Sequence, residues 1–275
     1  MKYWNEFVAP IPQIVGKKIK YDNNIYTFDI ETTSFFILKG KIHNAIEYKD
    51  LTKKEQEQCD FHCNMYIWML GVNDRVYYGR TWQELKDFIK IIDESNEGRK
   101  IIFVHNLSFE FQFLKSIFDF SDVLARISHK VMKCTLTDYN IEFRCSYFLS
   151  NCALKYLPKL FNLPVEKMVG DLDYNKLRHS KTRLDSIELG YCENDCLVVY
   201  YYIKKELEDY VRINKIPLTS TGHVRRELQE LTRTDWKYRK KVNKAINTDG
   251  HVYNMLLDAF QGRVHAPGIG YLLTK

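Results

Sequence analysis

The spacing of apolar and polar positions predicts strands through the first half of the chain. Short apolar runs and apolar–polar alternation are typical of buried and half-buried strands. They occur at residues 25–30, 65–72, 75–79, 101–104, 130–136 and 139–148. A short polar turn separates the second run from the third, and another separates the last two, so each of these pairs predicts a hairpin.

Helices are predicted where apolar residues recur every three or four positions. Thr81 is a suitable N-cap for a helix that runs to about residue 93, because its hydroxyl can accept a hydrogen bond from the first turn. Further helices are predicted at residues 107–118, 151–161 and 185–210. Strands first, followed by strands alternating with helices, indicate a mixed α/β domain.

The positive charge of the chain is concentrated in one segment near its C-terminus. Residues 212–244 contain ten Lys or Arg and three acidic residues, a net charge of +7, whereas the whole chain carries +6. Trp236 and Tyr238 are interleaved with these basic residues. Basic side chains neutralise phosphates and aromatic faces stack on unpaired bases, so we expect nucleic-acid contact here, with a solvated basic helix face as the alternative. The contacts are expected from Arg225, Arg226, Lys240 and Lys241.

No apolar run approaches the roughly 18–20 residues that a membrane helix needs. The N-terminus also lacks the apolar stretch of a secretory signal. We therefore expect an intracellular protein that does not engage a membrane.

The seven cysteines include no Cys-x-x-Cys pair. A zinc site at Cys59, His62 and Cys63 needs a fourth ligand, which the sequence does not offer. Reduced thiols in a reducing compartment are the favoured interpretation.

Three short patches with acidic residues carry the candidate chemistry, at residues 28–33 (FDIETT), 105–110 (HNLSFE) and 191–195 (YCEND). Each patch adjoins an apolar run, so each is expected at the edge of a buried element. Carboxylates brought together in such a place repel one another unless a cation lies between them. The three patches therefore indicate divalent metal ions.

The spacing within the patches allows their side chains to converge. Residues two apart on a strand point the same way, as do residues four apart on a helix. Three pairs have this spacing: Asp29 and Glu31 on a strand, Asn106 and Glu110 near a helix start, and Tyr191 and Asp195 on a helix. Oxygen ligands suit Mg²⁺ or Mn²⁺.

Two such ions, roughly 3.5–4 Å apart, can stabilise the attacking and the leaving oxygen of a phosphoryl displacement. A tyrosine hydroxyl can orient the attacking water. The predicted reaction is hydrolysis of a phosphodiester, and no Ser-His-Asp set, P-loop or GxGxxG motif competes with it.

As a set, the motifs resemble the proofreading domain of family-B DNA polymerases, in the DEDDy 3′–5′ exonuclease superfamily. The ETT of residues 31–33, the HNL-x-F of 105–109 and the Tyr-x₃-Asp of 191–195 are similar to the protein-primed branch of phages and linear plasmids. Further similar segments are residues 170–174 (GDLDY), 217–222 (PLTSTG) and 260–263 (FQGR, a linker motif between exonuclease and polymerase domains). The resemblance covers about residues 24–265.

The resemblance implies a ribonuclease-H-like mixed sheet flanked by helices, followed by a basic, mostly helical C-terminal appendage. The implied organisation is an N-terminal extension (1–23), an exonuclease domain (24–210) and an appendage or linker (211–275) toward a polymerase domain. Polymerase palm motifs are not found in these residues. We therefore expect the chain to be either a fragment or a subunit of a split enzyme, with a polymerase domain or chain as partner.

The resemblance also implies roles for individual residues. The two metal ions would be held by Asp29, Glu31, Asp195 and Glu110, and Tyr191 would position the water. The single-stranded 3′ end would be held by Thr32, Asn106 and Phe109, and Leu154 would be a further DNA-binding residue.

Several positions depart from the family pattern. Glu110 stands where the family usually has Asp, which extends the reach by one methylene, and a surface position is the alternative for it. Ala153 replaces the serine of a Ser-Leu DNA-binding motif, and Arg263 replaces a glycine of the linker motif. Val169 replaces a lysine, and whether Lys167 substitutes for that lysine is left open.

The expected function is a metal-dependent 3′–5′ exonuclease on single-stranded DNA ends, the proofreading part of a viral replicase, acting in the host cytoplasm if phage-encoded. The alternative is a catalytically weak module that binds single-stranded DNA, or docks a priming (terminal) protein, for a separate polymerase chain. An exonuclease acting on RNA is a third possibility, because nothing in the sequence reports contacts to a 2′-hydroxyl.

Overall fold

The computed structural model describes residues 1–168, 172, 173, 176–234, 237, 240 and 241. It divides into two compact units, Met1–Ser220 and Thr221–Lys275. Val169, Arg263, Trp236 and Tyr238 lie outside the described residues, as do most of residues 170–174 and all of 260–263. The three domain boundaries expected from the sequence remain predictions.

Eleven strands are found in the described residues. They are β1 (Lys2–Tyr3), β2 (Ile14–Val15), β3 (Tyr21–Asp22), β4 (Tyr26–Leu38), β5 (Lys41–Asn44), β6 (Asp60–Val72), β7 (Arg75–Gly79), β8 (Lys100–Val104), β9 (Phe120–Ala125), β10 (Val131–Leu136) and β11 (Ile141–Cys145). Nine of them form one sheet in the order β1-β7-β6-β4-β8-β11-β10-β9, with β5 paired to β4. The sheet is mixed, because β4 runs parallel to β8 but antiparallel to β6.

The α-helices of the described residues are α1 (Lys53–Gln56), α2 (Trp82–Glu94), α3 (Leu107–Leu114), α4 (Ser146–Ser150), α5 (Leu157–Phe161), α6 (Ser186–Tyr210) and α7 (Ser220–Thr234). The 3-10 helices are η1 (Trp4–Glu6), η2 (Ala45–Asp50), η3 (Leu154–Tyr156) and η4 (Ile213–Lys215). None of the helices in the described part of the chain is both long and apolar enough to cross a membrane. The observed architecture is therefore a mixed α/β fold with a large sheet flanked by helices, consistent with a ribonuclease-H-like fold.

The predicted hairpins β6–β7 and β10–β11 are confirmed as antiparallel pairs. Helix α2 begins after Thr81, whose hydroxyl accepts a hydrogen bond from the Glu84 N–H as predicted. The helix predicted at 107–118 ends at Leu114, and that predicted at 151–161 is divided into η3 and α5. The strand predicted at 139–148 ends at Cys145, where α4 begins. Strands β1, β2, β3, β5 and β9 were not predicted.

Alternation along β4 assigns its side chains to the two faces of the sheet. Tyr26, Phe28 and Ile30 belong to a core cluster that also contains Leu85 and Phe88 of α2. The intervening positions face helix α6, whose buried residues complete the core on that side. Asp29 and Glu31 are therefore on the face that α6 covers.

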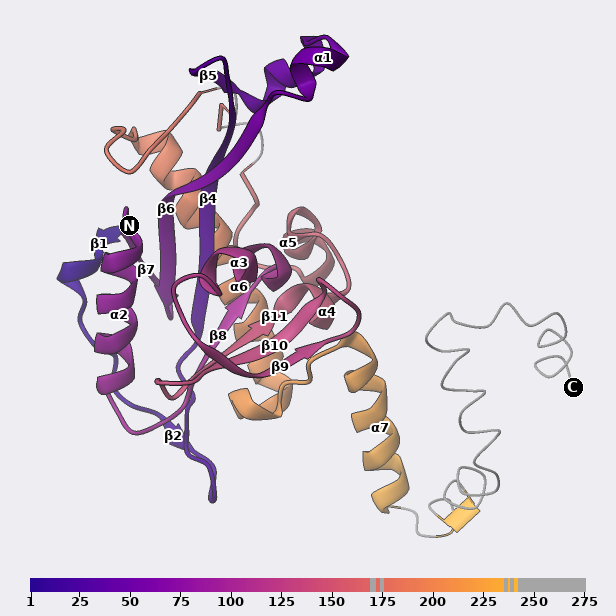
Figure 1. Cartoon of the computed structure of the whole chain (residues 1–275). Helices are drawn as coiled ribbons and strands as arrows, with labels where there is room; N and C mark the ends of the chain where they lie inside the picture. Colours follow the sequence, from indigo (N-terminus) through magenta and orange to yellow (C-terminus); the bar gives the residue numbers. More distant parts are fainter. Residues whose placement is uncertain (169–171, 174–175, 235–236, 238–239, 242–275) are drawn as a thin grey trace, which may run out of the picture. The chain divides into compact units, whose positions relative to one another are not determined.

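Strands β4 and β6 continue together beyond the rest of the sheet (Figure 1). Strand β8 pairs only with the first three residues of β4, whereas β6 pairs with β4 as far as Ile37. We call residues 34–63 the β-arm; it contains β5, η2 and α1 besides the ends of β4 and β6. Its own small core is aromatic, with Phe36, Tyr48 and Phe61 in mutual ring contact.

The start of β4 is fixed by Asp22, which is fully buried. Its carboxylate accepts hydrogen bonds from the N–H of Gln13 (3.3 Å), from Asn24, from the Tyr26 hydroxyl (2.7 Å) and from the Asn96 amide (2.8 Å). One side chain thus joins the N-terminal segment, β4 and the loop before β8.

Replacing Asp22 with Ala leaves several buried donors unpaired, so we expect the free energy of unfolding to fall by about 2–4 kcal/mol. Chemical denaturation followed by circular dichroism measures the change. The matched control is Asp74→Ala in the exposed β6–β7 turn, for which a change within about 0.5 kcal/mol is expected. Equal losses in the two variants would contradict the assignment.

Candidate metal centre

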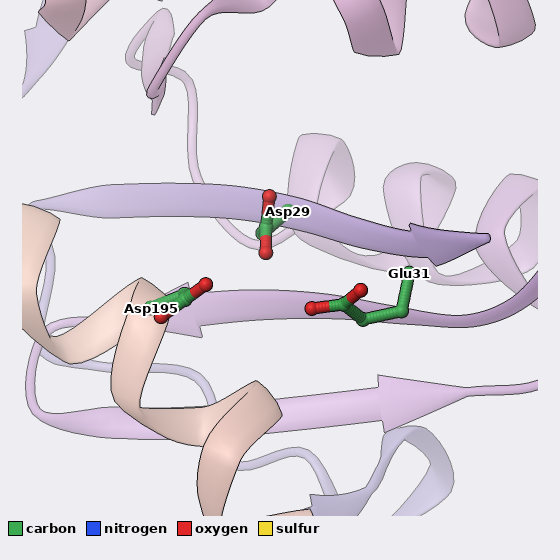
Figure 2. A group of neighbouring side chains, drawn as sticks. All are labelled: Asp29, Glu31 and Asp195. Atoms are coloured by element: carbon green, nitrogen blue, oxygen red, sulfur yellow. The ribbon is translucent and has the colours of Figure 1, made fainter. Parts of the chain in front are cut away.

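Three carboxylates from two elements lie together on the α6 side of the sheet. Asp29 and Glu31 project from β4 toward Asp195 of α6 (Figure 2). One oxygen of each residue lies within 4.8 Å of the oxygens of the other two. Among the described residues this is the only group of His, Cys, Asp or Glu side chains with such spacing.

Burial raises the pKa values of all three acids, and repulsion by neighbouring carboxylates adds to this effect at Asp29 and Glu31. Burial is the largest cause for each of the three. The pKa of Asp29 is raised well above its ordinary value, with the charges of Asp195, Glu110 and Glu31 adding to the effect of burial. The pKa of Glu31 is raised to about 7 by burial and by Asp195. The cluster therefore resists carrying its full negative charge.

Glu110 of α3 is the fourth acid at this place. Its side chain is only 3% exposed, so the alternative of a surface position is wrong. Burial raises its pKa to about 8, and Asp29 and Glu31 are among the neighbours that influence it. Within the described part of the chain its Oε2 atom has no hydrogen-bond partner. A buried carboxylate oxygen without a partner is costly, which makes it a candidate cation ligand.

A lysine supplies positive charge to the cluster. The Lys167 ammonium forms an ion pair with Asp195 and lies 3.8 Å from the centroid of the Tyr191 ring. Its charge opposes the rise in the pKa of Asp195 and of Asp29 and Glu31. Sequence reasoning left the role of Lys167 open, and the structure brings it into contact with the acids.

Asn194 of α6 holds the segment that carries Lys167. Its side-chain amide donates to the carbonyl of Glu166 (2.8 Å), and its oxygen accepts from the N–H of Met168 (2.9 Å). The backbone is therefore clamped on both sides of Lys167.

A cleft adjoins the acid cluster. Its volume is about 370 Å³. It is lined by Ile30, Glu31, Thr32, Thr33, Ser34, Asn44, Ala45, Ile46, Tyr66, Phe109, Lys176 and Arg178. Of the residues expected to contact DNA, Thr32 and Phe109 line the cleft. Asn106 is exposed and directly precedes α3. Leu154 lies elsewhere, half-buried against the core beneath α6.

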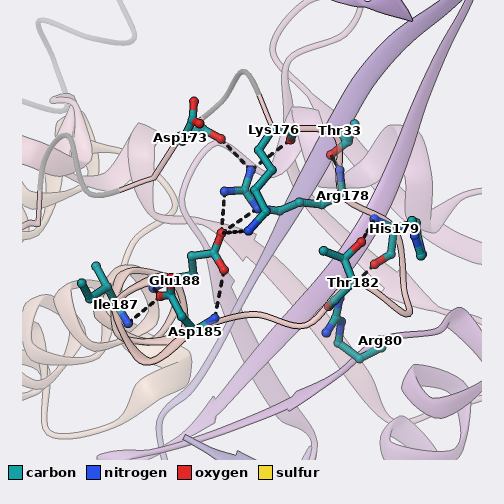
Figure 3. A network of polar contacts seen from close by, with 10 residues as sticks. All are labelled: Thr33, Arg80, Asp173, Lys176, Arg178, His179, Thr182, Asp185, Ile187 and Glu188. Carbon is teal, nitrogen blue, oxygen red and sulfur yellow. Dashed lines mark hydrogen bonds and ion pairs between the residues drawn. The ribbon is translucent and has the colours of Figure 1, made fainter. Parts of the chain in front are cut away.

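A polar network fixes the wall of this cleft (Figure 3). The Arg178 guanidinium donates to Glu188 (2.6 and 2.9 Å) and to the carbonyl of Asp173 (2.6 Å). The Arg178 N–H donates to the Thr33 hydroxyl (3.1 Å). Burial alone would raise the pKa of Glu188, but hydrogen bonds from Asp185 and Arg178 lower it. The segment before α6 is thereby tied to β4.

Sequence reasoning missed Arg178, Lys176 and the β-arm residues of the cleft. The only signal was a pair of basic residues two apart, which is too common to be informative.

The basic residues beyond Ser220 belong to the second unit. Arg225 and Arg226 lie on α7, and Arg226 forms an ion pair with Glu230 (2.9 Å). Lys240 and Lys241 are exposed. The expected contact of all four with nucleic acid stays a prediction.

The alternative zinc site is not formed by the described residues. Cys59 donates to the backbone carbonyl of Glu55, His62 pairs with Asp60, and Cys63 accepts from Ser34. All seven cysteines are free.

Together, the fold and the site define a mixed α/β protein with a buried acidic cluster that could bind metal. No family model and no curated protein sequence matches the chain. Solved structures do match. One is phi29 DNA polymerase complexed with single-stranded DNA, with a TM-score of 0.55 and 14% identity over 79% of this chain and 36% of that one. Another is the same polymerase complexed with primer-template DNA, with a TM-score of 0.56 and 15% identity over 81% and 36%.

This chain thus spans about a third of the length of the polymerase that it matches. At this level of identity, the similarity establishes a shared fold.

The raised pKa values predict how stability depends on pH. The unfolded chain loses the protons of Glu31 and Glu110 near the ordinary value of 4.5, whereas the folded protein retains them to about 7 and 8. Without divalent ions, stability should therefore fall as pH rises from about 6.5 to 8. Burial lowers the pKa of His105 to about 4. His105 therefore makes stability rise with pH between about 4 and its unfolded value of 6.5, below the range in which the fall is expected. Thermal unfolding in EDTA at several pH values measures the effect.

Mn²⁺ should raise the melting temperature more at pH 8 than at pH 6.5, because its ligands must be ionised. Glu31→Gln should reduce the slope in EDTA, and Glu208→Gln on the exposed side of α6 should retain it. A melting temperature that is independent of pH across this window would contradict the raised pKa values.

Proposed function

We propose that this chain is a metal-dependent 3′–5′ exonuclease that hydrolyses single-stranded DNA ends, the proofreading part of a protein-primed replicase. The observation that carries the proposal is the convergence of Asp29, Glu31 and Asp195 within 4.8 Å of one another. Desolvated carboxylates at this separation are stabilised by a bound divalent cation. The fold shared with phi29 DNA polymerase supports the same reading.

The residues present fit Mg²⁺ or Mn²⁺. All donors are carboxylate oxygens, which hard cations prefer. Two ions would be held by Asp29, Glu31, Asp195 and Glu110. Glu110 is counted as a ligand because its Oε2 atom has no hydrogen-bond partner among the described residues. When bound, such ions polarise a phosphate and lower the pKa of a water molecule.

The chain's own groups would then orient the reactants. Tyr191 lies one helical turn before Asp195 on α6, so its hydroxyl would direct the attacking water. The ammonium of Lys167, beside Asp195, would offset the negative charge of the phosphate. Burial of the site would strengthen both interactions by excluding water.

Contacts to DNA are proposed in each unit by itself. In the first unit, Thr32, Asn106 and Phe109 would hold the 3′ end, and Phe109 is 41% exposed, which leaves its ring available for stacking. Leu154 is a further proposed contact of this unit. In the second unit, the proposed contacts are Arg225, Arg226, Lys240 and Lys241. The proposed partners are a polymerase domain or chain and a priming protein.

A catalytically weak DNA-binding module is the second candidate. It is favoured by Lys167, which already neutralises Asp195, and by Glu110, which stands where the resembling family has the shorter Asp. Such a module would bind single strands without efficient hydrolysis.

The double variant Asp29→Ala, Glu31→Ala tests the proposal. Metal stabilisation of the transition state is worth several kcal/mol, so hydrolysis should fall about a hundredfold or more. In Mg²⁺ or Mn²⁺, the wild type should degrade a 5′-labelled single-stranded oligonucleotide to a ladder of labelled products that are shortened from the 3′ end. Binding of the same oligonucleotide should persist in the variant.

Glu208→Ala serves as the matched control and should hydrolyse at the wild-type rate. Unchanged hydrolysis in the double variant would exclude this metal centre. Binding by the wild type without hydrolysis would favour the second candidate, and a matched RNA oligonucleotide tests the third.

Glu110→Gln tests the fourth ligand separately. The amide keeps the shape but removes the charge, so we expect the affinity for Mn²⁺ and the rate of hydrolysis to fall about tenfold or more. Mn²⁺ binding is measured by electron paramagnetic resonance. Glu110→Asp keeps the charge and should be affected less. Wild-type Mn²⁺ affinity in Glu110→Gln would show that Glu110 is not a ligand.

A further inference from the structure

Two arginines fasten the segment that leads into helix α6 (Figure 3). From the loop after β7, the Arg80 guanidinium donates to the carbonyls of His179 (3.0 Å) and Thr182 (2.9 Å). From within the segment, the Arg178 guanidinium donates to the Glu188 carboxylate of α6 (2.6 and 2.9 Å). Hydrogen bonds from charged groups are stronger than those between neutral groups, so the path of this segment is firmly held.

The ion pair between Arg178 and Glu188 is buried. Each of the two residues is 5% exposed. The Glu188 carboxylate also accepts from the N–H of Asp185 (2.9 Å) and from the Lys176 ammonium (3.3 Å). A buried ion pair repays its loss of hydration only when its geometry is good and its remaining polar atoms are bonded. This pair meets both conditions, so the two side chains fix each other's position.

Arg178 also contacts the strand that carries two of the acids. Its backbone N–H donates to the hydroxyl of Thr33 (3.1 Å), which lies two residues after Glu31 on β4. Its partner Glu188 lies seven residues, or about two helical turns, before Asp195 on α6. One arginine therefore bonds both to β4 beside Glu31 and to the helix that carries Asp195.

Burial and bonding leave neither partner of the pair open to a ligand. Besides its two bonds to Glu188, the Arg178 guanidinium donates to the carbonyls of Asp173 (2.6 Å) and Lys176 (3.1 Å). Glu188 does not belong to the group of acids with metal-ligand spacing in the described part of the chain. An effect of the pair on the metal centre would therefore be exerted through the acids.

The charge of Arg178 reaches the acid cluster. It is one of the charges that oppose the rise in the pKa of Glu31. A positive charge at this place by itself disfavours a second cation nearby. A favourable contribution of Arg178 to metal binding would therefore come from the position in which it holds β4 and α6, and this difference in sign can be measured.

We propose that the buried Arg178–Glu188 ion pair positions the metal centre: it holds β4 at Thr33 against the first turn of α6, so that Glu31 and Asp195 can bind one cation together. The inference rests on the metal centre of the proposed function. It adds two positioning residues that lie outside the acidic motifs and contact neither the cation nor the DNA.

The experiment measures the affinity of the full chain for Mn²⁺ by electron paramagnetic resonance, without DNA. Arg178→Met and Glu188→Gln each break the ion pair. We expect the dissociation constant for Mn²⁺ to rise about tenfold or more in both, as it does when residues that orient metal ligands are replaced. All variants are compared at a temperature at which circular dichroism shows them folded, so a loss of stability alone does not change the result.

The direction of the change separates positioning from a direct effect of charge. Loss of the Arg178 charge by itself should strengthen Mn²⁺ binding, and loss of the Glu188 charge by itself should weaken it. If the pair acts as one unit, both variants bind Mn²⁺ more weakly. The double variant Arg178→Met, Glu188→Gln should then lose no more affinity than either single variant.

The matched control is Arg144→Met. Arg144 is likewise buried, and its guanidinium donates to Glu142 on the same strand, β11 (2.5 Å). This variant should lose thermal stability, because a buried carboxylate loses a partner. It should bind Mn²⁺ like the wild type.

Wild-type or higher affinity for Mn²⁺ in Arg178→Met would overturn the inference. Glu188→Gln is the milder change and decides the question if Arg178→Met does not fold, and wild-type affinity in this variant would overturn the inference as well. So would additive losses in the double variant, or an equal loss in Arg144→Met.

The inference and the proposed function fail separately. Hydrolysis that needs Asp29 and Glu31, together with wild-type Mn²⁺ affinity in Arg178→Met and Glu188→Gln, refutes the inference alone. Mn²⁺ binding that needs the ion pair, without hydrolysis by the wild type, refutes the exonuclease alone.

Discussion

Electrostatic repulsion among buried carboxylates is the constraint on which the rest of this structure depends. Two like unit charges about 4 Å apart repel each other by about 4 kcal/mol at an effective dielectric constant of 20. This energy is larger than the stabilisation that an exposed salt bridge provides. Asp29, Glu31 and Asp195 lie within such distances, and Glu110 is buried beside them. Raised pKa values and the ion pair with Lys167 are two ways in which the protein offsets this repulsion. A divalent cation is a third, and it alone allows all the acids to be ionised together.

The fold holds these charges together by placing them on strand β4 and helix α6, which pack against each other. Strand β4 is paired with β6 where it carries Asp29, and β8 pairs with the three residues of β4 that precede Asp29. Helix α6 packs across that face with most of its residues buried. Asn194, next to Asp195, clamps the segment of Lys167 to the same helix. The acids and their internal counter-charge thus share one scaffold, so a cation that binds must compete with a lysine that is already in place.

Local patterns predicted the elements that carry the acids. Apolar patterning predicted the first part of β4, the β6–β7 hairpin and α6. The spacing of Asp29, Glu31 and Asp195 indicated that they converge, as they do. The remainder depends on contacts between distant segments. The β-arm lacks a buried face of the large sheet, so its strands carry only a weak periodic signal. Lys167 and Arg178 lie in irregular backbone, and their positions follow from partners on α6. No sequence period reports such pairings.

The acid cluster and the adjoining cleft bear on different parts of the proposed function. In the proposed function, carboxylates around a cation would act on a phosphodiester, but the acids alone do not select among phosphates. The cleft adjoins these acids through Glu31, and its walls include the exposed apolar side chains of Ile46 and Phe109. The bulge at Tyr66 lies opposite Glu31 and Thr32, so the same irregularity in β6 positions a cleft residue beside a candidate metal ligand.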